Sequence, residues 1–157
     1  ARKLTFAEAE ARVRAVHQPY HAALAALIAE ARARHGAAIL IDWHSMPAAA
    51  AQRGGEACDI VLGDRFGAAC ASRIATFVER ELAAMGYRVA RNAPYAGGYT
   101  TEHYGRPGRK THALQIELSR ALYFDEAAQA PTDGLGRLTA DLARFFEALA
   151  AQDWGGL

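Results

Sequence analysis

The sequence predicts an α/β domain whose mostly parallel or mixed sheet is flanked by helices. Segments with apolar residues at helical spacing alternate along the chain with short apolar runs that end in glycine or polar residues. Such alternation is typical of helices packed on a largely parallel sheet. The chain has 157 residues, 52% of them hydrophobic, which is enough for one core, so we expect a single domain over residues 1–157.

The first helix is expected from Thr5 to about His35. Thr5 and Glu8 have the spacing of a capping box, in which each side chain bonds the other residue's backbone N–H. Pro19 lacks a backbone N–H and is expected to break or restart the helix near Gln18. Gly36 follows His35 and provides a stop signal.

The rest of the chain is expected to alternate between strands and helices. Four short strands are predicted at residues 37–42, 59–63, 87–91 and 113–118. Helices are predicted at residues 68–85 and 135–150, and loops at residues 46–56 and 92–111. The second loop is long for a small domain, and loops of that length are usually functional or disordered.

Charge and cysteine content exclude several classes of protein. The 18 basic and 17 acidic residues nearly balance, which does not favour nucleic-acid binding. Cys58 and Cys70 are too few for a disulfide framework, so a reducing cytoplasm is the expected compartment. Because no apolar run approaches about 20 residues, we expect no membrane span.

The motif Asp42-Trp43-His44-Ser45 ends the first predicted strand. Side chains two apart on a strand share a face, so Asp42 and His44 are expected to point the same way, at the end where α/β sheets bind ligands. Imidazole is a common zinc ligand, and a nearby carboxylate can either ligate the metal or orient the ring. From this motif alone, a histidine satisfied at a strand end is the simpler interpretation.

Glu117 lies near the end of the last predicted strand, on the same face as Gln115. Burial raises the pKa of a carboxyl group, whereas a cation such as Arg120 or a metal lowers it. A glutamate in this position suits a general base that activates water. The alternative is a structural ion pair between Glu117 and Arg120.

The segment from Asn92 to Gly105 combines flexible glycines with three tyrosines and precedes Arg106, Arg109 and Lys110. It lacks the spacing of a phosphate-binding loop. Phenols and cations near glycines suit a lid that closes over a small anionic substrate. The alternative is a solvated connection that carries a few basic residues.

Five stretches, taken in order, cover almost the whole chain and resemble the N-formylglutamate amidohydrolase (N-formylglutamate deformylase) family. They are Pro19-Tyr20-His21, Ile41-Asp42-Trp43-His44-Ser45-Met46-Pro47, residues 59–67 from Asp59 to Gly67, residues 92–99 from Asn92 to Tyr99, and residues 112–123 from His112 to Tyr123.

The resemblance implies a phosphorylase/hydrolase-like fold related to the zinc carboxypeptidases. It also implies hydrolysis of N-formyl-L-glutamate to formate and L-glutamate, a step of histidine degradation, with Zn²⁺ or another divalent metal as cofactor. His44 and Asp42 would bind the metal, and Glu117 would take a proton from the metal-activated water and pass it to the amine. The substrate, a small anionic N-acyl amino acid, would contact Arg65, Asn92, Tyr95, Tyr99, Arg109 and Arg120.

The chain resembles only the later part of the family pattern. The family's early strands, with their own histidine and acidic zinc ligands, have no counterpart before Ala1, and a catalytic zinc normally needs three protein ligands. Either the chain is a fragment, which we favour, or residues such as His103 or His112 complete the site. Missing strands would leave an exposed sheet edge, through which we expect homo-oligomers. The alternatives to deformylase activity are a non-catalytic scaffold and a zinc amidase acting on another N-acyl amino acid or a peptide.

Overall fold

The computed structural model describes residues 2–52 and 57–157. The chain divides into two compact units, Ala1–Ala38 and Ile39–Leu157, and each is described by itself. The prediction of one domain over residues 1–157 stays a prediction.

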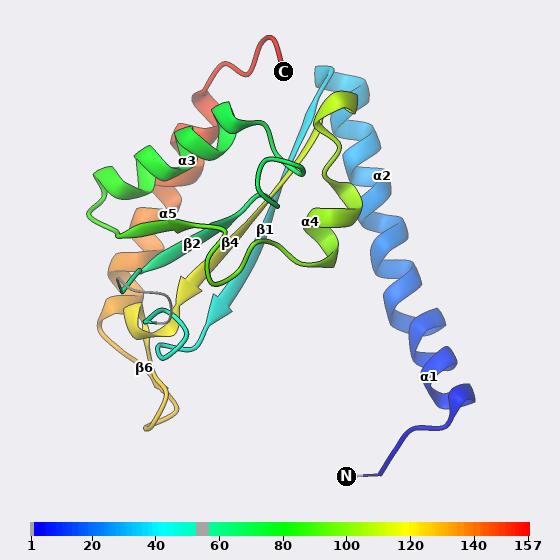
Figure 1. Cartoon of the computed structure of the whole chain (residues 1–157), viewed down its shortest axis with the longest axis horizontal. Helices are drawn as coiled ribbons and strands as arrows, with labels where there is room; N and C mark the ends of the chain where they lie inside the picture. Colours follow the sequence, from blue (N-terminus) through cyan, green and yellow to red (C-terminus); the bar gives the residue numbers. More distant parts are fainter. Residues whose placement is uncertain (1, 53–56) are drawn as a thin grey trace. The chain divides into compact units, whose positions relative to one another are not determined.

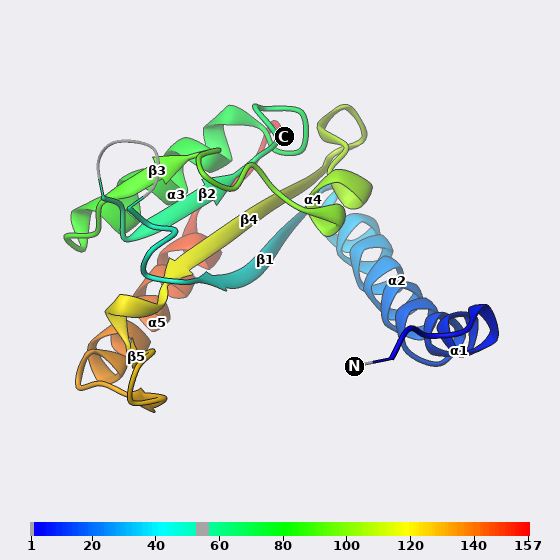
Figure 2. The same ribbon diagram turned by 60° about the horizontal axis from the view of Figure 1, so that its bottom comes forward.

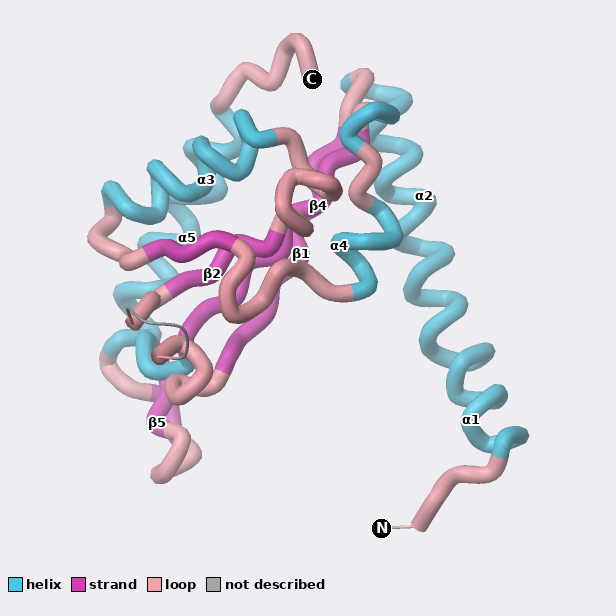
Figure 3. Tube along the Cα trace, in the orientation of Figure 1, coloured by secondary structure: helices cyan, strands magenta, loops and turns pink. Residues whose placement is uncertain are grey.

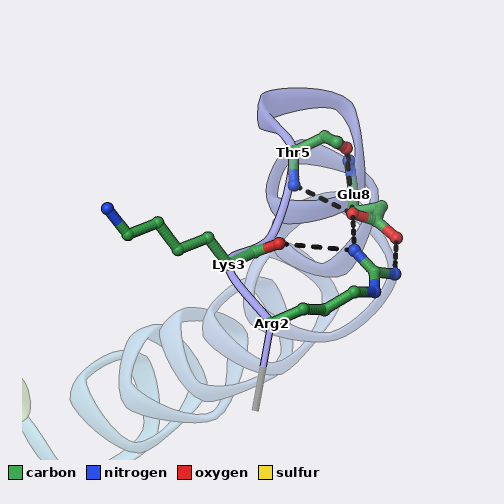
Figure 4. Close-up of polar contacts among 4 residues, drawn as sticks. All are labelled: Arg2, Lys3, Thr5 and Glu8. Carbon is green, nitrogen blue, oxygen red and sulfur yellow. Dashed lines mark hydrogen bonds and ion pairs between the residues drawn. The ribbon is translucent and has the colours of Figure 1, made fainter.

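The first unit is helical and begins with the predicted capping box. Helix α1 spans Phe6–Arg12, the Thr5 hydroxyl accepts from the Glu8 backbone N–H, and the Glu8 carboxylate accepts from the Thr5 N–H. Arg2 adds an ion pair to the same carboxylate (Figure 4). The Arg2 guanidinium and then the Thr5 N–H lower the pKa of Glu8 to about 2.

The helix restarts at Gln18, which is one of the two outcomes that the sequence predicts for Pro19. A π-helical turn, Val13–His17, leads directly into α2, Gln18–His35, and Pro19 lies in the first turn of α2. Proline is tolerated in the first turn of a helix, where the backbone N–H that it lacks would have no partner within that helix. The predicted stop is confirmed, because Gly36 takes a left-handed φ of 77° directly after His35.

The second unit contains a four-stranded mixed sheet in the order β1-β4-β2-β3 (Figure 1). The strands are β1 Ala38–Met46, β2 Ile60–Gly63, β3 Val89–Arg91 and β4 Thr111–Ser119. Strand β2 pairs parallel with β3 and antiparallel with β4. The arrows of the neighbouring strands β1 and β4 point the same way (Figures 1 and 2). The sheet is therefore mixed, one of the two arrangements that the sequence predicts.

Two amphipathic helices cover one face of this sheet. They are α3, Ser72–Ala84, and α5, Gly134–Ala151. Their apolar residues pack with alternate residues of the strands in the main core, which includes Ile74, Val78, Leu82, Leu138 and Phe145 of the helices and Ile60, Leu62, Leu114, Ile116 and Leu118 of the strands. Trp43 of β1 joins this side, edge-on to Phe145 at 6.1 Å between ring centroids. The alternating strand residues point to the other face of the sheet, and several of them are polar.

That other face holds a smaller apolar cluster and a short helix. The cluster consists of Met46, Ala50, Ala51, Cys58 and Val61. The short helix, α4, spans Tyr99–Tyr104 and packs beside β4. Further along the chain, the strands β5 Phe124–Asp125 and β6 Ala130–Pro131 pair as a separate antiparallel ribbon.

Several element boundaries differ from those predicted. Strand β1 continues to Met46, and most of its residues are only half-buried, because β1 is an outer strand of the described sheet and its Asp42 face is open. The segment predicted as one long loop contains α4 and a 3₁₀ turn at Pro107–Arg109 (Figure 3). Helix α3 begins at Ser72 rather than near residue 68. In the loop predicted at residues 46–56, Gly54 and Gly55 lie outside the described residues.

No helix in the described ranges is long and apolar enough to cross a membrane.

Candidate active site

Four polar side chains gather on the sheet face opposite α3 and α5. On β1, Ile41 and Trp43 pack into the main core, so the alternating Asp42 and His44 point to the other face. On β4, Leu114 and Ile116 lie in the core, so Gln115 and Glu117 share the opposite face. Because β1 and β4 are neighbours, these four residues form one polar surface.

His44 and Asp42 form a pair on β1. The His44 Nε2 lies 3.1 Å from the Asp42 Oδ2, with the His44 side chain 46% exposed and the Asp42 side chain 15% exposed. A carboxylate in this position fixes the orientation of the ring and leaves the other ring nitrogen, Nδ1, for a ligand. Of the two roles that the sequence allows for Asp42, the geometry supports orientation of His44.

Glu117 is a buried carboxylate that accepts a hydrogen bond from Gln115. It is 7% exposed, and its register partner on β2 is the fully buried Val61. The Gln115 Nε2 donates to the Glu117 Oε1 at 2.9 Å. Burial raises the pKa of Glu117, with His44 and the Gln115 hydrogen bond opposing that rise. A carboxylate with a raised pKa binds protons more readily, which is the property a general base requires.

Arg120 follows β4 at the start of a 3₁₀ turn, Arg120–Leu122. Its guanidinium pairs with Glu126 at 3.0 Å, while its Nε donates to the Ser45 hydroxyl at 3.4 Å. The backbone N–H of Ala48 donates to the second oxygen of Glu126. The structure thus pairs Arg120 with Glu126 and not with Glu117, the partner considered from the sequence.

Arg65 lies in a tightly bonded turn after β2. Arg65 and Phe66 both have a φ of 56°, in the left-handed region. Asn92 stabilises this turn, because its Oδ1 accepts from the backbone N–H groups of Asp64 and Phe66 and its Nδ2 donates to Asp64. The Arg65 guanidinium pairs with Glu102 of α4 at 3.1 Å.

The remaining predicted substrate residues are spread along the segment between β3 and β4. Tyr95 and Tyr99 are 36% and 55% exposed, and Tyr99 stacks on His103 at 5.0 Å. Arg109 is exposed in the 3₁₀ turn before β4. Glu117 lies six residues along β4 from Thr111, roughly 20 Å at the rise of a strand. The structure therefore does not bring Arg109 to Glu117.

The described residues supply only part of a metal site. Within residues 2–52 and 57–157, no group of three or more His, Cys, Asp or Glu side chains is arranged to hold a metal ion. His112 does not complete the pair on β1, because it lies on the helix-covered face, where its Nδ1 accepts from the Ala71 N–H. A catalytic zinc normally has three protein ligands. His44 and Asp42 therefore fit one part of a zinc site and not a whole one.

Sequence reasoning did not assign a role to Gln115 and Gly63, which shape the surroundings of Glu117. Gln115 is 4% exposed and links Glu117 to the backbone of Gly98. Gly63 is the register partner of Gln115. The period of two in Gln115-Ile116-Glu117 places the amide beside the carboxylate, but its second partner, Gly98, comes from a segment whose path the sequence does not specify.

A buried carboxylate beside a histidine–aspartate pair, on the sheet face opposite α3 and α5, has the features of an acid–base site in a hydrolytic enzyme. The sequence pattern of N-formylglutamate amidohydrolase matches residues 1–124, which is more than half of the chain. The chain therefore belongs to the N-formylglutamate amidohydrolase family.

Individual relatives agree with this assignment. The chain is 38% identical over 115 residues to an N-formylglutamate deformylase of Pseudomonas aeruginosa, covering 72% of this chain and 43% of that protein. It is 34% identical over 113 residues to the N-formylglutamate deformylase of Pseudomonas putida, covering 71% of this chain and 42% of that protein. The chain thus spans less than half the length of these two relatives.

Solved structures show the same fold. The crystal structure of N-formylglutamate amidohydrolase from Ralstonia eutropha JMP134 superposes with a TM-score of 0.89 at 40% sequence identity, covering 95% of this chain and 55% of that one. A protein from Agrobacterium tumefaciens superposes with a TM-score of 0.63 at 22% identity and supports the fold alone.

Proposed function

We propose that the protein hydrolyses N-formyl-L-glutamate to formate and L-glutamate, a step of histidine degradation. The observation that carries the proposal is the buried Glu117 on one sheet face with His44 and Asp42, in a chain of the N-formylglutamate amidohydrolase family. The names of its relatives supply the substrate.

Glu117 acts as the general base in this proposal. It takes a proton from the attacking water, whose oxygen bonds to the formyl carbon. The same proton then passes to the glutamate nitrogen as the carbon–nitrogen bond breaks, so that formic acid and the free amine leave and the acid gives its remaining proton to the amine or to water. Burial of Glu117 favours its protonated state between these two transfers.

The substrate carries two carboxylates, which suit bidentate binding by arginines. Arg120 and Arg65 are the candidates, and each already pairs with a carboxylate, Glu126 at 3.0 Å and Glu102 at 3.1 Å. The carboxylates of a bound substrate would therefore displace Glu126 and Glu102 from these arginines. Asn92, Tyr95, Tyr99 and Arg109 stay predictions as substrate contacts.

His44, oriented by Asp42, would hold zinc or another divalent metal, with further ligands from outside the described residues. When bound, zinc polarises a carbonyl and lowers the pKa of bound water to roughly 7.

A non-catalytic scaffold is the second candidate, because the described residues offer His44 and Asp42 where a catalytic zinc needs three ligands. Such a scaffold keeps the fold and binds a small anion through arginines such as Arg120. A zinc amidase that acts on another N-acyl amino acid or a peptide is the remaining alternative within the same chemistry.

We also propose that the protein works in the cytoplasm and forms homo-oligomers. Cys58 and Cys70 are free and buried, as in proteins of reducing compartments. Strand β1 is an outer strand of the described sheet, and such edges pair readily with other chains. A strictly monomeric sedimentation profile at high protein concentration would contradict the oligomer.

Formate release from N-formyl-L-glutamate, measured with zinc present, tests the function. We expect the unaltered protein to release formate and Glu117→Gln to lose nearly all turnover, with Glu147→Gln, a change at an exposed residue of α5, as the matched control. Faster turnover of N-acetyl-L-glutamate or of a formylated peptide would favour the other amidase. Absence of hydrolysis with every substrate would favour the scaffold.

A further inference from the structure

The side chain of Gln115 is bonded at both ends of its amide. The Gly98 backbone N–H donates to the Gln115 Oε1 at 2.7 Å, and the Gln115 Nε2 donates to the Glu117 Oε1 at 2.9 Å. Gln115 is 4% exposed and Glu117 is 7% exposed, so water competes little for these bonds. The two bonds connect the carboxylate to the backbone that leads into α4.

These partners fix the orientation of the amide. A backbone N–H can only donate, so Gly98 requires the oxygen of the Gln115 amide to face it. The Nε2 then faces Glu117, where it can only donate, and it selects a carboxylate oxygen as acceptor. Glu117 Oε1 is thereby held, while the Gln115 bond does not engage Oε2.

Gly63 allows the Gly98 segment to come this close. It is the register partner of Gln115 on β2. A Cβ at Gly63 would lie 2.6 Å from the Gly97 nitrogen and 2.7 Å from the Ala96 carbonyl carbon, both backbone atoms. Any side chain at residue 63 would push this segment away from the sheet, and the Gly98 N–H would move away from Gln115.

We propose that Gln115 is a positioning residue for Glu117, and that the close approach of the Ala96–Gly98 backbone to Gly63 fixes the orientation of the Gln115 side-chain amide. The proposal rests on the proposed function, in which Glu117 is the general base. The position of the base then depends on how the segment between β3 and β4 is seated. A displacement of about 1 Å at a reacting group is enough to reduce a rate about 100-fold.

Nuclear magnetic resonance of the whole chain tests the positioning directly, without any need for turnover. We expect the side-chain amide protons of Gln115 to exchange with solvent at least about 10-fold more slowly than those of the exposed Gln18, since the Gln115 amide is buried and bonded. Gln115→Leu is expected to shift the Glu117 carboxyl carbon resonance, whereas Gln18→Leu leaves it unchanged. Gly63→Ala is expected to speed the exchange of the Gln115 amide and shift the same carboxyl resonance.

Equal exchange rates for the two glutamines would overturn the proposal, and so would an unshifted Glu117 resonance in Gln115→Leu. With formate release as a second measurement, Gln115→Leu should lower kcat about 10- to 100-fold and leave KM within about twofold. If the resonances behave as expected and the unaltered protein releases no formate, the positioning stands and the proposed function fails. A raised KM at unchanged kcat would instead make Gln115 a substrate contact and overturn the positioning role.

Discussion

Asn92 offers a sharp test, because the family resemblance makes it a substrate contact while the structure uses its side chain to build a turn. Its amide makes three hydrogen bonds, accepting from the N–H groups of Asp64 and Phe66 and donating to the Asp64 carboxylate at 2.8 Å. Neutral bonds contribute about 1 kcal/mol each, and a bond to a charged group contributes about 1.5–3 kcal/mol. Because the site is half-buried, we expect Asn92→Ala to lower the free energy of unfolding by about 2–4 kcal/mol.

The backbone at residue 92 provides a matched control. Its φ of 59° lies in the left-handed region, where alanine is strained by roughly 1–2 kcal/mol and glycine is not. Asn92→Gly removes the same hydrogen bonds without that strain, although glycine makes the unfolded chain more flexible by about 0.4–1 kcal/mol. The glycine variant should therefore be more stable than the alanine variant by about 0.5–1 kcal/mol.

Urea unfolding followed by circular dichroism measures both differences, with unchanged m values as the check that only stability has moved. At this chain length the alanine variant should also unfold about 5–10 °C below the unaltered protein. An Asn92→Ala protein within about 0.5 kcal/mol of the unaltered one would refute the structural role. A raised KM in that stable variant would restore Asn92 to the substrate site.

Two further predictions concern buried groups away from the site. The Tyr87 hydroxyl donates to the buried Asp141 at 2.7 Å, so Tyr87→Phe should cost about 1.5–3 kcal/mol of stability, while the exposed control Tyr20→Phe should cost nothing measurable in the same urea unfolding. Burial, followed by the Asp141 bond, raises the pKa of Tyr87 to about 12. In the unfolded chain tyrosine ionises near pH 10, so the unaltered protein should lose stability between about pH 10 and 12 and Tyr87→Phe should lose less. The same loss of unfolding free energy with pH in both proteins would contradict this. Burial lowers the pKa of His112 in the folded protein. The stability that neutral His112 contributes is therefore present above about pH 6.5, the pKa of histidine in the unfolded chain, and is lost as the pH falls below that value. His112→Gln keeps an acceptor for the Ala71 N–H but does not titrate, so the variant should lose less stability than the unaltered protein between pH 7 and pH 5, as measured by urea unfolding at both pH values. Equal losses in the two proteins would show that His112 does not cause the acid destabilisation.

The sequence predicts the strands well because apolar periodicity reports burial. The strand over residues 113–118 is confirmed within β4, whose nine residues are all buried. The half-burial of β1 does not follow from its composition, since local apolarity does not reveal that a strand lies at the edge of a sheet. Pro19 shows a related limit, because it indicates where α2 begins but not that a π-helical turn, Val13–His17, leads directly into it.

The candidate site could be predicted only as far as alternation along one strand reaches. The shared face of Asp42 and His44 follows from their spacing, as does that of Gln115 and Glu117. The partners of Arg120 and Arg65 lie off the strands, Glu126 beyond the next turn and Glu102 on α4, and alternation along a strand does not give these pairs. The sequence also does not show that the backbone around Gly98 lies close against the sheet, an approach that depends on a glycine at residue 63.

In the proposed function His44 holds the metal and Glu117 transfers the proton, and zinc titration separates these two roles most directly. Isothermal calorimetry on the unaltered chain, His44→Ala, Glu117→Gln and the exposed control His35→Ala would give four zinc affinities under one set of conditions. We expect equal affinities for the unaltered chain, Glu117→Gln and His35→Ala, and an affinity at least about 10-fold weaker for His44→Ala. Zinc binding that survives in His44→Ala, or that is lost equally in Glu117→Gln, would contradict these two roles.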